Sequence, residues 1–237
     1  MEAQGIPRNR IIDGRVFQIP NLDFLRLLKE GIAYGILENN FVSSDSIMYP
    51  RFFKIKNSNT TVTMGVNSYM SVLIEDGIFK NSSISLGNFS SIAWNVTFEL
   101  GLNGDHNFKN VSQYGLWRFG WSIPDNFLLP HESYKILIGS DVWIGRGCTL
   151  KCTNPEKPLV IGDGAIIASD SVVVKNIPPY AIVGGNPAQV IKYRFPPHVI
   201  EALLRIKWWD WSLDKIHDNF KYFNDVEKFI SLHDKED

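Results

Sequence analysis

The chain repeats itself every six residues in IGSDVWIGRGCTL (138–150) and again in IGDGAIIASDSVVVKNIP (161–178). The first position of each hexad is aliphatic and the second is mostly Gly or Ala. The fifth is small or aliphatic, as in Val142, Cys148, Ala165, Ser171 and Ile177. A short fixed period is typical of a repeat fold, in which each unit buries its apolar face by stacking on the next. A period of six fits neither an amphipathic helix nor simple strand alternation.

Flat strands of a few residues that meet at three corners satisfy this period, with aliphatic side chains pointing into each coil. Gly follows the aliphatic residue at many corners, where we expect a tight backbone with positive φ. Coils of this kind stack at about 4.8 Å, the spacing between strands. LGNFSS (86–91) and IAWNVT (92–97) are the clearest early turns, and counting back in sixes from Leu86 places the first coil near Ile74. The sequence therefore predicts a mainly β solenoid.

Three segments of the repeat resemble a known family: IGSDVWIGRG (138–147), IGDGAIIA (161–168) and PPYAIVGGNPA (178–188). They are similar to the hexapeptide-repeat acyltransferases. Within that family the resemblance is to the xenobiotic acetyltransferase branch, which includes type B chloramphenicol and streptogramin acetyltransferases, and to related sugar O-acetyltransferases. NGDH (103–106) and IKWWDW (206–211) support that branch. The resemblance implies a left-handed parallel β-helix, whereas the general rule for parallel crossovers predicts a right-handed one.

The chain divides into three expected parts. Residues 1–73 form an N-terminal arm with a short helix after Asn21 and strands, which could be a substrate-side subdomain. Residues 74–195 form the β-helix, interrupted by a long loop at 103–137, and long loops without regular structure are often functional. Residues 196–237 form C-terminal capping helices, because Pro196 and Pro197 suit a helix start and Ser212 suits an N-cap. Terminal repeats of a solenoid need such a cap.

Composition narrows the class of protein further. The net charge is −1, from 24 basic and 25 acidic side chains, so nothing steers the chain toward nucleic acid or an anionic membrane. The start of the chain has no apolar leader and no 18-residue apolar run occurs, so we expect a cytoplasmic protein without membrane insertion. Cys148 and Cys152 are too few for a disulfide framework, and Cys148 occupies an inward position as a small hydrophobe.

His106 is the candidate catalytic residue, because it lies where the regular coils give way to the long loop. Acyl transfer from a thioester to a hydroxyl needs a base, and imidazole titrates near neutrality. From the residues alone, a histidine beside a loop is more often a polar surface residue than a catalytic one. Its Asn-Gly-Asp-His context resembles the catalytic histidine segment of the family, which implies the role of general base. A backbone carbonyl, Asp105 or Glu99 could orient the ring.

A metal site is not expected. The hexapeptide-repeat carbonic anhydrases hold zinc with three histidines, whereas here only His106 lies on or beside the coils. The sequence has no His-x-x-x-His or Cys-x-x-Cys spacing. The remaining histidines lie in expected loops or helices and are taken as solvated: His131, His198, His217 and His233.

Acetyl-coenzyme A needs small-residue coils that its pantetheine arm can approach, and cations for its phosphates. The coils around Gly145, Arg146 and Ser169 fit the first need, and Lys175, Lys192 and Arg194 fit the second, although each lysine could equally be a solvated charge. The resemblance implies a groove between two subunits of a homotrimer. The resulting candidate cofactor residues are Trp143, Gly145, Arg146, Ser169, Lys175, Gly185, Lys192 and Arg194.

The acceptor is expected beside the loop, where Asp105, Tyr114 and Trp117 are the candidate substrate-binding residues. Aromatic faces suit sugar rings and flat drugs alike, and they could equally pack the loop against a neighbouring subunit. The candidate aromatic wall comprises Phe108, Tyr114, Trp117, Phe119 and Trp121. Drug-acetylating relatives often carry a Ser-Thr-Tyr-Pro-Phe run after the histidine, whereas this chain reads VSQYGLW (111–117).

These observations predict an acetyl-coenzyme A-dependent O-acetyltransferase that transfers the acetyl group directly, because no Cys or Ser lies in a nucleophile context. The first expected acceptor is a carbohydrate, such as a cell-surface glycan (a polysaccharide) or its precursor. An antibiotic hydroxyl of the chloramphenicol or streptogramin type comes second, and N-acetylation of an amino sugar third. The alternative outside enzymology is a solenoid that serves only as a binding module.

Overall fold

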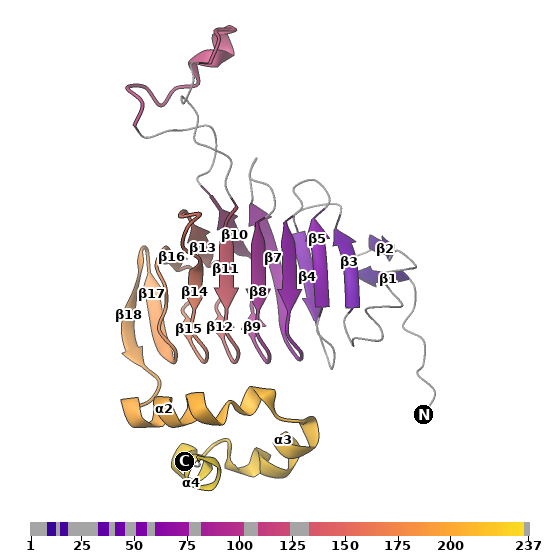
Figure 1. Cartoon of the computed structure of the whole chain (residues 1–237), viewed down its shortest axis with the longest axis vertical. Coiled ribbons are helices and arrows are strands. Elements are labelled where there is room, and N and C mark those ends of the chain that lie inside the picture. The colour runs from indigo at the N-terminus through magenta and orange to yellow at the C-terminus, as the bar shows by residue number, and fades with distance from the viewer. Residues whose placement is uncertain are drawn as a thin grey trace.

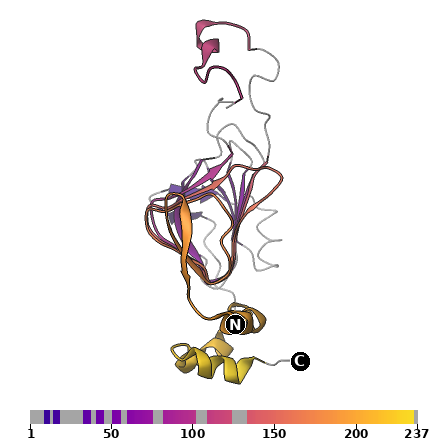
Figure 2. The same ribbon diagram turned by 90° about the vertical axis from the view of Figure 1, so that its left-hand side faces the viewer.

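The structure is a computed structural model that describes the backbone of residues 9–12, 15–18, 33–37, 41–45, 51–55, 60–75, 82–101, 109–123 and 133–234. Most of these residues form a stack of flat coils, whose axis follows the row of strands in Figure 1. Seen along that axis, each coil is a flattened ring of strands joined by tight turns (Figure 2). The period of six therefore corresponds to strands and turns of a parallel β solenoid.

Each coil places one strand on each of three faces. The first face holds β6 (Thr61–Met64), β8 (Ser83–Leu86), β11 (Lys135–Ile138) and β14 (Leu159–Ile161), paired in parallel. The second face holds the start of β7 (Tyr69–Glu75), then β9 (Ser91–Ile92), β12 (Trp143–Ile144), β15 (Ile166–Ile167) and β17 (Ala181–Gly185). The third face holds the end of β7, then β10 (Val96–Leu100), β13 (Thr149–Cys152) and β16 (Val172–Val173).

The strands before the regular coils pair in a mixed pattern. β1 (Asn9–Ile12) and β2 (Arg15–Gln18) form an antiparallel pair. Three more strands extend the sheets of the coils: β3 (Ala33–Leu37), β4 (Phe41–Asp45) and β5 (Arg51–Ile55). Parallel pairing between coils already includes β6 and β7, so it begins before the expected start near Ile74. The helix expected after Asn21 lies outside the described residues.

The core of the solenoid is the column of inward side chains that the hexads predict. First and fifth positions of both hexad stretches are buried, between 0% and 6% exposed. They are Ile138, Val142, Ile144, Cys148, Leu150, Ile161, Ala165, Ile167, Ser171, Val173 and Ile177. Side chains of one coil contact those of the next, so burial of each coil depends on its neighbours. This confirms the core assignment made from the repeat.

The repeated glycines are required for close packing, and not for the positive φ expected from the sequence. Positive φ occurs three residues after the inward aliphatic residue, and the residue at that place is often not glycine. At one corner these residues are Asn67, Phe89, Asp141, Gly164 and Tyr180, with φ between 54° and 68°. The glycine that follows the aliphatic residue has no positive φ. It is required because the next coil lies against it: a Cβ on Gly87 would stand 2.6 Å from the carbonyl carbon of Gly139.

Each coil bends at three corners, and each corner is a column of turns. The first corner comprises the turns at 66–67, 88–89, 140–141, 163–164 and 179–180, between the first and second faces. The second corner comprises 94–95, 146–147 and 169–170, between the second and third faces. The third corner includes 153–158 and 174–176, and the long loop leaves the coils there. The loop ends before residue 135, earlier than expected, because Lys135–Ile138 pairs with β8.

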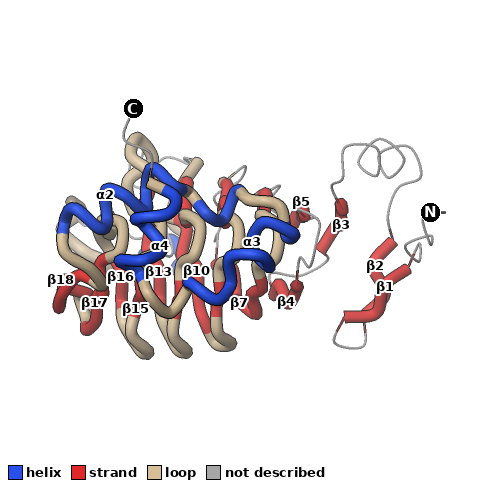
Figure 3. Tube along the Cα trace, turned by 90° about the horizontal axis from the view of Figure 1, so that it is seen from below, coloured by secondary structure: helices blue, strands red, loops and turns tan. Residues whose placement is uncertain are grey.

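The C-terminal helices lie along the first corner, below the row of turns in Figure 1 and across the coils in Figure 3. They are α2 (Pro197–Ile206), α3 (Leu213–Asn219) and α4 (Val226–His233), joined by 3₁₀ turns at Trp208–Asp210 and Phe220–Tyr222. Ser212 caps α3 as predicted, since its Oγ accepts a hydrogen bond of 3.2 Å from the Lys215 amide. The starts of α2 and α3 therefore lie close to the positions that the sequence indicates.

The sequence suggested that the helices cover the end of the stack. In the structure they instead cover one side of it. Phe89 and Tyr180 project from the first corner and pack against α2 and the Trp208 turn, which gives the helices an apolar surface there. Asn88 Nδ2 also donates a 3.3 Å hydrogen bond to the Trp209 carbonyl. The last coil is instead followed by β18 (Ala188–Tyr193), which turns back antiparallel to β17.

In the part of the chain that the structure describes, no helix combines the length and the apolar character needed to cross a membrane. The cytoplasmic location stays a prediction from the sequence. The division at residues 73 and 195 also stays a prediction.

The first-corner packing leads to a stability prediction for Gly164→Ala. A Cβ on Gly164 would lie 2.6 Å from the Tyr180 ring, in a residue with a φ of +68°. We expect the free energy of unfolding to fall by about 2–3 kcal/mol, from strain and overpacking together. Gly120→Ala is the matched control, because its φ is +78° but nothing lies within 4 Å, so the loss should be about 1 kcal/mol. Urea unfolding of both variants measures the difference, and equal losses would contradict this explanation.

Candidate functional site

The predicted catalytic segment falls in the long loop, and His106 and Asp105 lie outside the described residues. The coil that leads into the loop is described up to Gly101. On that coil, the carboxylate of Glu99 lies 2.7 Å from the Lys151 ammonium of the next coil. Glu99, one of the residues suggested to orient the histidine, is therefore already engaged in an ion pair on the third face.

Several candidate cofactor residues come together at the second corner, where three coils stack on one another. Gly145 donates its amide to the Ile167 carbonyl at 2.8 Å, and a Cβ on Gly145 would lie 2.6 Å from the Ser169 amide nitrogen. Gly185, one coil further, donates its amide to Ser171 Oγ at 3.2 Å. Gly145 is therefore buried against the next coil, whereas Ser169 and Gly185 are exposed and leave backbone at this corner that a pantetheine arm could contact.

An exposed cation and two exposed indoles lie at the same corner. The guanidinium of Arg146 stands over the Trp94 ring at 5.1 Å from its centroid, a cation–π distance. Trp143 is also exposed, on the outer side of β12. Sequence reasoning missed Trp94, although the hexad alignment could have found it, because Trp94, Arg146 and Ser169 occupy equivalent turn positions in successive coils.

The remaining predicted cations are spread over the fold. Lys192 lies on β18 opposite Ile182, in the row of outward side chains that includes Ile166 and Trp143. Lys175 lies at the third corner and is exposed. The structure therefore brings Lys192 to the edge of the same face as Trp143, whereas Lys175 lies on another side of this chain.

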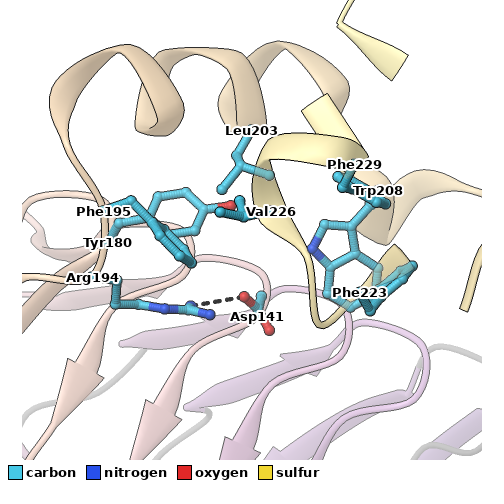
Figure 4. A pocket seen from close by; sticks show the side chains of 9 residues that line it. All are labelled: Asp141, Tyr180, Arg194, Phe195, Leu203, Trp208, Phe223, Val226 and Phe229. Atoms are coloured by element: carbon cyan, nitrogen blue, oxygen red, sulfur yellow. Dashed lines mark hydrogen bonds and ion pairs between the residues drawn. The ribbon is translucent and has the colours of Figure 1, made fainter. Parts of the chain in front are cut away.

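Arg194 has a different environment from the other candidates, because it lies against the first corner. Its Nη1 donates to Asp141 Oδ2 at 2.9 Å and to the Gly164 carbonyl at 2.7 Å, and its guanidinium stands 5.1 Å from the centroid of the Tyr180 ring (Figure 4). Burial raises the pKa of the Asp141 carboxyl, although the charge of Arg194 opposes that shift. Arg194 thus joins three turns within the chain, a role that the sequence did not indicate.

The described part of the long loop, residues 109–123, carries an exposed aromatic cluster. Tyr114 and Phe119 have ring centroids 6.1 Å apart, and Phe119 and Trp121 are 5.4 Å apart. All three side chains are exposed, so their faces are available to a ligand or a second chain. The side chains of Phe108 and Trp117 lie outside the described residues. In Figure 1 the segment 109–123 lies at the opposite side of the coils from the helices.

Among the described residues, no three His, Cys, Asp or Glu side chains gather as a metal-binding group. Both cysteines are free thiols and are buried.

Several acetyltransferases are similar in sequence to this chain over much of its length. A probable macrolide acetyltransferase of Lysinibacillus sphaericus is 36% identical over 167 residues, which cover 67% of this chain and 88% of that protein. A chloramphenicol acetyltransferase of Klebsiella aerogenes is 37% identical over 55% of this chain and 61% of that protein. A virginiamycin A acetyltransferase of Staphylococcus aureus is 35% identical over 60% of this chain and 64% of that protein. The chain thus matches less than two thirds of the length of the last two relatives.

Solved structures give a weaker likeness. The hexapeptide-repeat acetyltransferase VCA0836 of Vibrio cholerae, complexed with acetyl-coenzyme A, has a TM-score of 0.41 and 21% identity, over 57% of this chain and 61% of that chain. The polysialic acid-specific acetyltransferase NeuO has a TM-score of 0.45 and 18% identity, over 70% of this chain and 63% of that chain. No protein-family model matches the chain.

The parallel coils with their repeat of six, together with the identity to an acetyltransferase along most of that protein's length, define the class. This chain belongs to the hexapeptide-repeat acyltransferases. The resemblance seen in the sequence is confirmed, and so is the assignment to an enzyme class. A solenoid that serves only as a binding module is set aside for the same reason.

The contacts of Arg194 lead to a prediction about stability. A double-mutant cycle of Asp141→Asn and Arg194→Met should give a coupling energy of about 1 kcal/mol, because the two side chains form an ion pair in which each is 25% exposed. Lys192→Met is the control for loss of a nearby cation, and it should change the free energy of unfolding by less than about 0.5 kcal/mol. Denaturant unfolding of the four proteins measures the coupling. Strict additivity would show that the pair contributes nothing to the fold.

Proposed function

We propose that this protein is an acetyl-coenzyme A-dependent O-acetyltransferase whose acceptor is the hydroxyl of an antibiotic-like small molecule. The observation that carries the proposal is the 36% identity to a probable macrolide acetyltransferase, which extends over 88% of that protein. The chloramphenicol and virginiamycin A acetyltransferases point to the same acceptor class. These relatives reverse the order of acceptors expected from the sequence, where the carbohydrate came first.

A carbohydrate acceptor is the second candidate, and a feature of the loop favours it. Residues 111–117 read VSQYGLW, in place of the Ser-Thr-Tyr-Pro-Phe run expected of drug-acetylating relatives. The exposed rings of Tyr114, Phe119 and Trp121 suit the apolar face of a sugar as well as a flat drug. The two candidates therefore differ in the loop and share the same transfer chemistry.

In the proposed reaction His106 acts as the general base. Its imidazole takes the proton of the acceptor hydroxyl while the oxygen attacks the thioester carbonyl carbon. The tetrahedral intermediate then collapses, the carbon–sulfur bond breaks, and the imidazolium returns the proton to the departing thiolate. No covalent acetyl-enzyme is needed, because the acceptor oxygen itself is the nucleophile. The orienting partner of the histidine is proposed to be a backbone carbonyl or Asp105, since Glu99 is paired with Lys151.

We propose that the donor lies along the second corner. The exposed Ser169 and Gly185 offer a backbone without bulky side chains, Gly145 lets Ser169 lie close against its coil, and the exposed Arg146 and Lys192 offer cations for phosphates. Lys175, at the third corner, can join this site only from another copy of the chain. This separation supports the predicted homotrimer with the cofactor between two subunits. Large exposed apolar side chains on the coils fit such an interface: Tyr69, Leu73, Trp143, Val190, Ile191 and Tyr193.

We also propose that the coils wind left-handed. The support is the period of six and the membership of the chain in the hexapeptide-repeat acyltransferases.

An acceptor panel tests the proposed function. The protein is incubated with acetyl-coenzyme A and either a macrolide, chloramphenicol or virginiamycin A, or a series of sugars, amino sugars and glycans. We expect free thiol to be released above the blank with at least one of the drugs. Mass spectrometry should find that drug heavier by roughly 42 Da, the mass of one acetyl group less the hydrogen that it replaces. Thiol release with sugars alone would replace the first candidate by the second. No release with any acceptor would contradict both.

The role of His106 gives a separate prediction. His106→Ala should lower the rate of thiol release by about 10²–10⁴-fold, which is the usual contribution of a general base. His198→Ala is the matched control, because His198 is an exposed residue near the start of α2, at the first corner. If His106→Ala were as active as His198→Ala, the proposed mechanism would be wrong while the transferase activity stood.

A further inference from the structure

A pocket lies between the first corner and the C-terminal helices, beside their packed contacts, and the proposed acetyl transfer does not use it. Its volume is about 130 Å³. Asp141, Tyr180 and Arg194 line it from the coil side (Figure 4). Side chains after the coils supply an apolar wall: Phe195, Leu203, Trp208, Phe223, Val226 and Phe229. We call this space the helix pocket.

The hydroxyl of Tyr180 is the chemically unusual feature of the helix pocket. Tyr180 is 1% exposed, and its hydroxyl makes no hydrogen bond with any residue that the structure describes. In Figure 4 the oxygen points between Leu203 and Val226, toward the helices. A buried hydroxyl without a partner destabilises the fold, because the hydrogen bonds that it made to water are not replaced. A ligand that supplies a hydrogen-bonding oxygen would remove that cost.

The charges in the helix pocket restrict what can enter. Asp141 and Arg194 form an ion pair of 2.9 Å and their side chains remain 25% exposed, so the polar end is accessible from solvent. The pair is electrically neutral as a unit. A charged ligand would lose its hydration and meet no net opposite charge in return, whereas a neutral molecule can hydrogen-bond to either side chain. The pocket therefore favours a neutral ligand with a polar end.

The size and the walls define the rest of the ligand. An apolar cavity of about 150 Å³ holds one benzene molecule, and the helix pocket is slightly smaller at about 130 Å³. Trp208 and Phe223 offer ring edges and faces, with centroids 5.1 Å apart at 78°. A single aromatic ring fits such walls by edge-to-face contact.

We propose that the helix pocket binds a neutral aromatic alcohol or phenol of about one ring. The ring would lie among Trp208, Phe223 and Phe229, and the ligand hydroxyl would meet Tyr180 and the Asp141–Arg194 pair. Such a ligand contacts the coils and the helices at once, so it would stabilise the docking of the helices. The proposed acetyl-transfer residues lie at the second corner and on the loop, so this binding is independent of the proposed function.

Four probes of similar size test the chemistry in the full-length protein: benzyl alcohol, toluene, benzoate and benzylamine. Binding is measured by ligand-observed NMR and by the shift in Tm, without acetyl-coenzyme A. Benzyl alcohol should bind most tightly and, at ten times its Kd, raise Tm by roughly 3 °C. Tighter binding of benzoate or benzylamine, or binding of toluene as tight as that of benzyl alcohol, would overturn the proposal.

Tyr180→Phe locates the bound alcohol. Phe89 already occupies the equivalent turn position with a φ of 56°, against 55° for Tyr180, so phenylalanine fits this backbone. The variant should bind benzyl alcohol about tenfold more weakly, because one hydrogen bond to the buried hydroxyl is lost, and bind toluene as before. Tyr193→Phe, an exposed tyrosine on β18, is the control and should leave both affinities unchanged.

Val226→Phe adds a second test, since it fills the helix pocket and should abolish the binding of benzyl alcohol and toluene alike. Benzyl alcohol that binds Tyr180→Phe as tightly as the parent protein, for example at the loop aromatics, would overturn the proposal whether or not Val226→Phe folds.

Discussion

Coils of this solenoid approach one another so closely at two corners that a Cβ atom does not fit between them. A Cβ on Gly139, at the first corner, would lie 2.8 Å from the Asp163 amide nitrogen, and one on Gly145, at the second, would lie 2.6 Å from the Ser169 amide nitrogen. This close approach allows the same residues to donate across coils, as Gly139 does to the Ile161 carbonyl at 2.8 Å. The second position of the hexad is therefore set by the space between backbones, and the inward aliphatic side chains fill what that spacing leaves.

Buried serines connect the turns of the first corner and satisfy polar groups that the stacking removes from water. Ser90 Oγ donates to the Gly139 carbonyl at 2.9 Å and accepts from the Val142 amide at 3.1 Å. Ser68 and Ser140 make similar contacts with the coil between them, at 2.6 Å to the Gly87 carbonyl and at 3.1 Å from the Asn88 amide. Because each buried hydroxyl would be costly without these partners, the ladder disfavours any slip of one coil against the next.

The sequence predicted the repeat, its inward residues and the C-terminal helices, because each depends on contacts that recur at fixed spacing, such as Ile144 and Ile167. It did not predict the side of the solenoid that the helices cover. That depends on Phe89 and Tyr180, which project from turns far apart in the chain and adjacent in space. The assignment of Arg194 to cofactor phosphates rested on charge alone. A sequence cannot indicate that Asp141 and the Gly164 carbonyl, in two different coils, hold that guanidinium.

Because every coil repeats the same three corners, a single substitution within a column of turns can create a new surface. At the first corner Asn67, Phe89, Asp141 and Tyr180 carry side chains at the position of positive φ, and Gly164 does not. The Tyr180 ring occupies the space that a side chain at Gly164 would fill, with ring carbons 2.6–2.8 Å from that Cβ position. The Gly164 carbonyl remains free to accept from Arg194, which brings the guanidinium to Asp141. The helix pocket therefore follows from one missing side chain in an otherwise regular column.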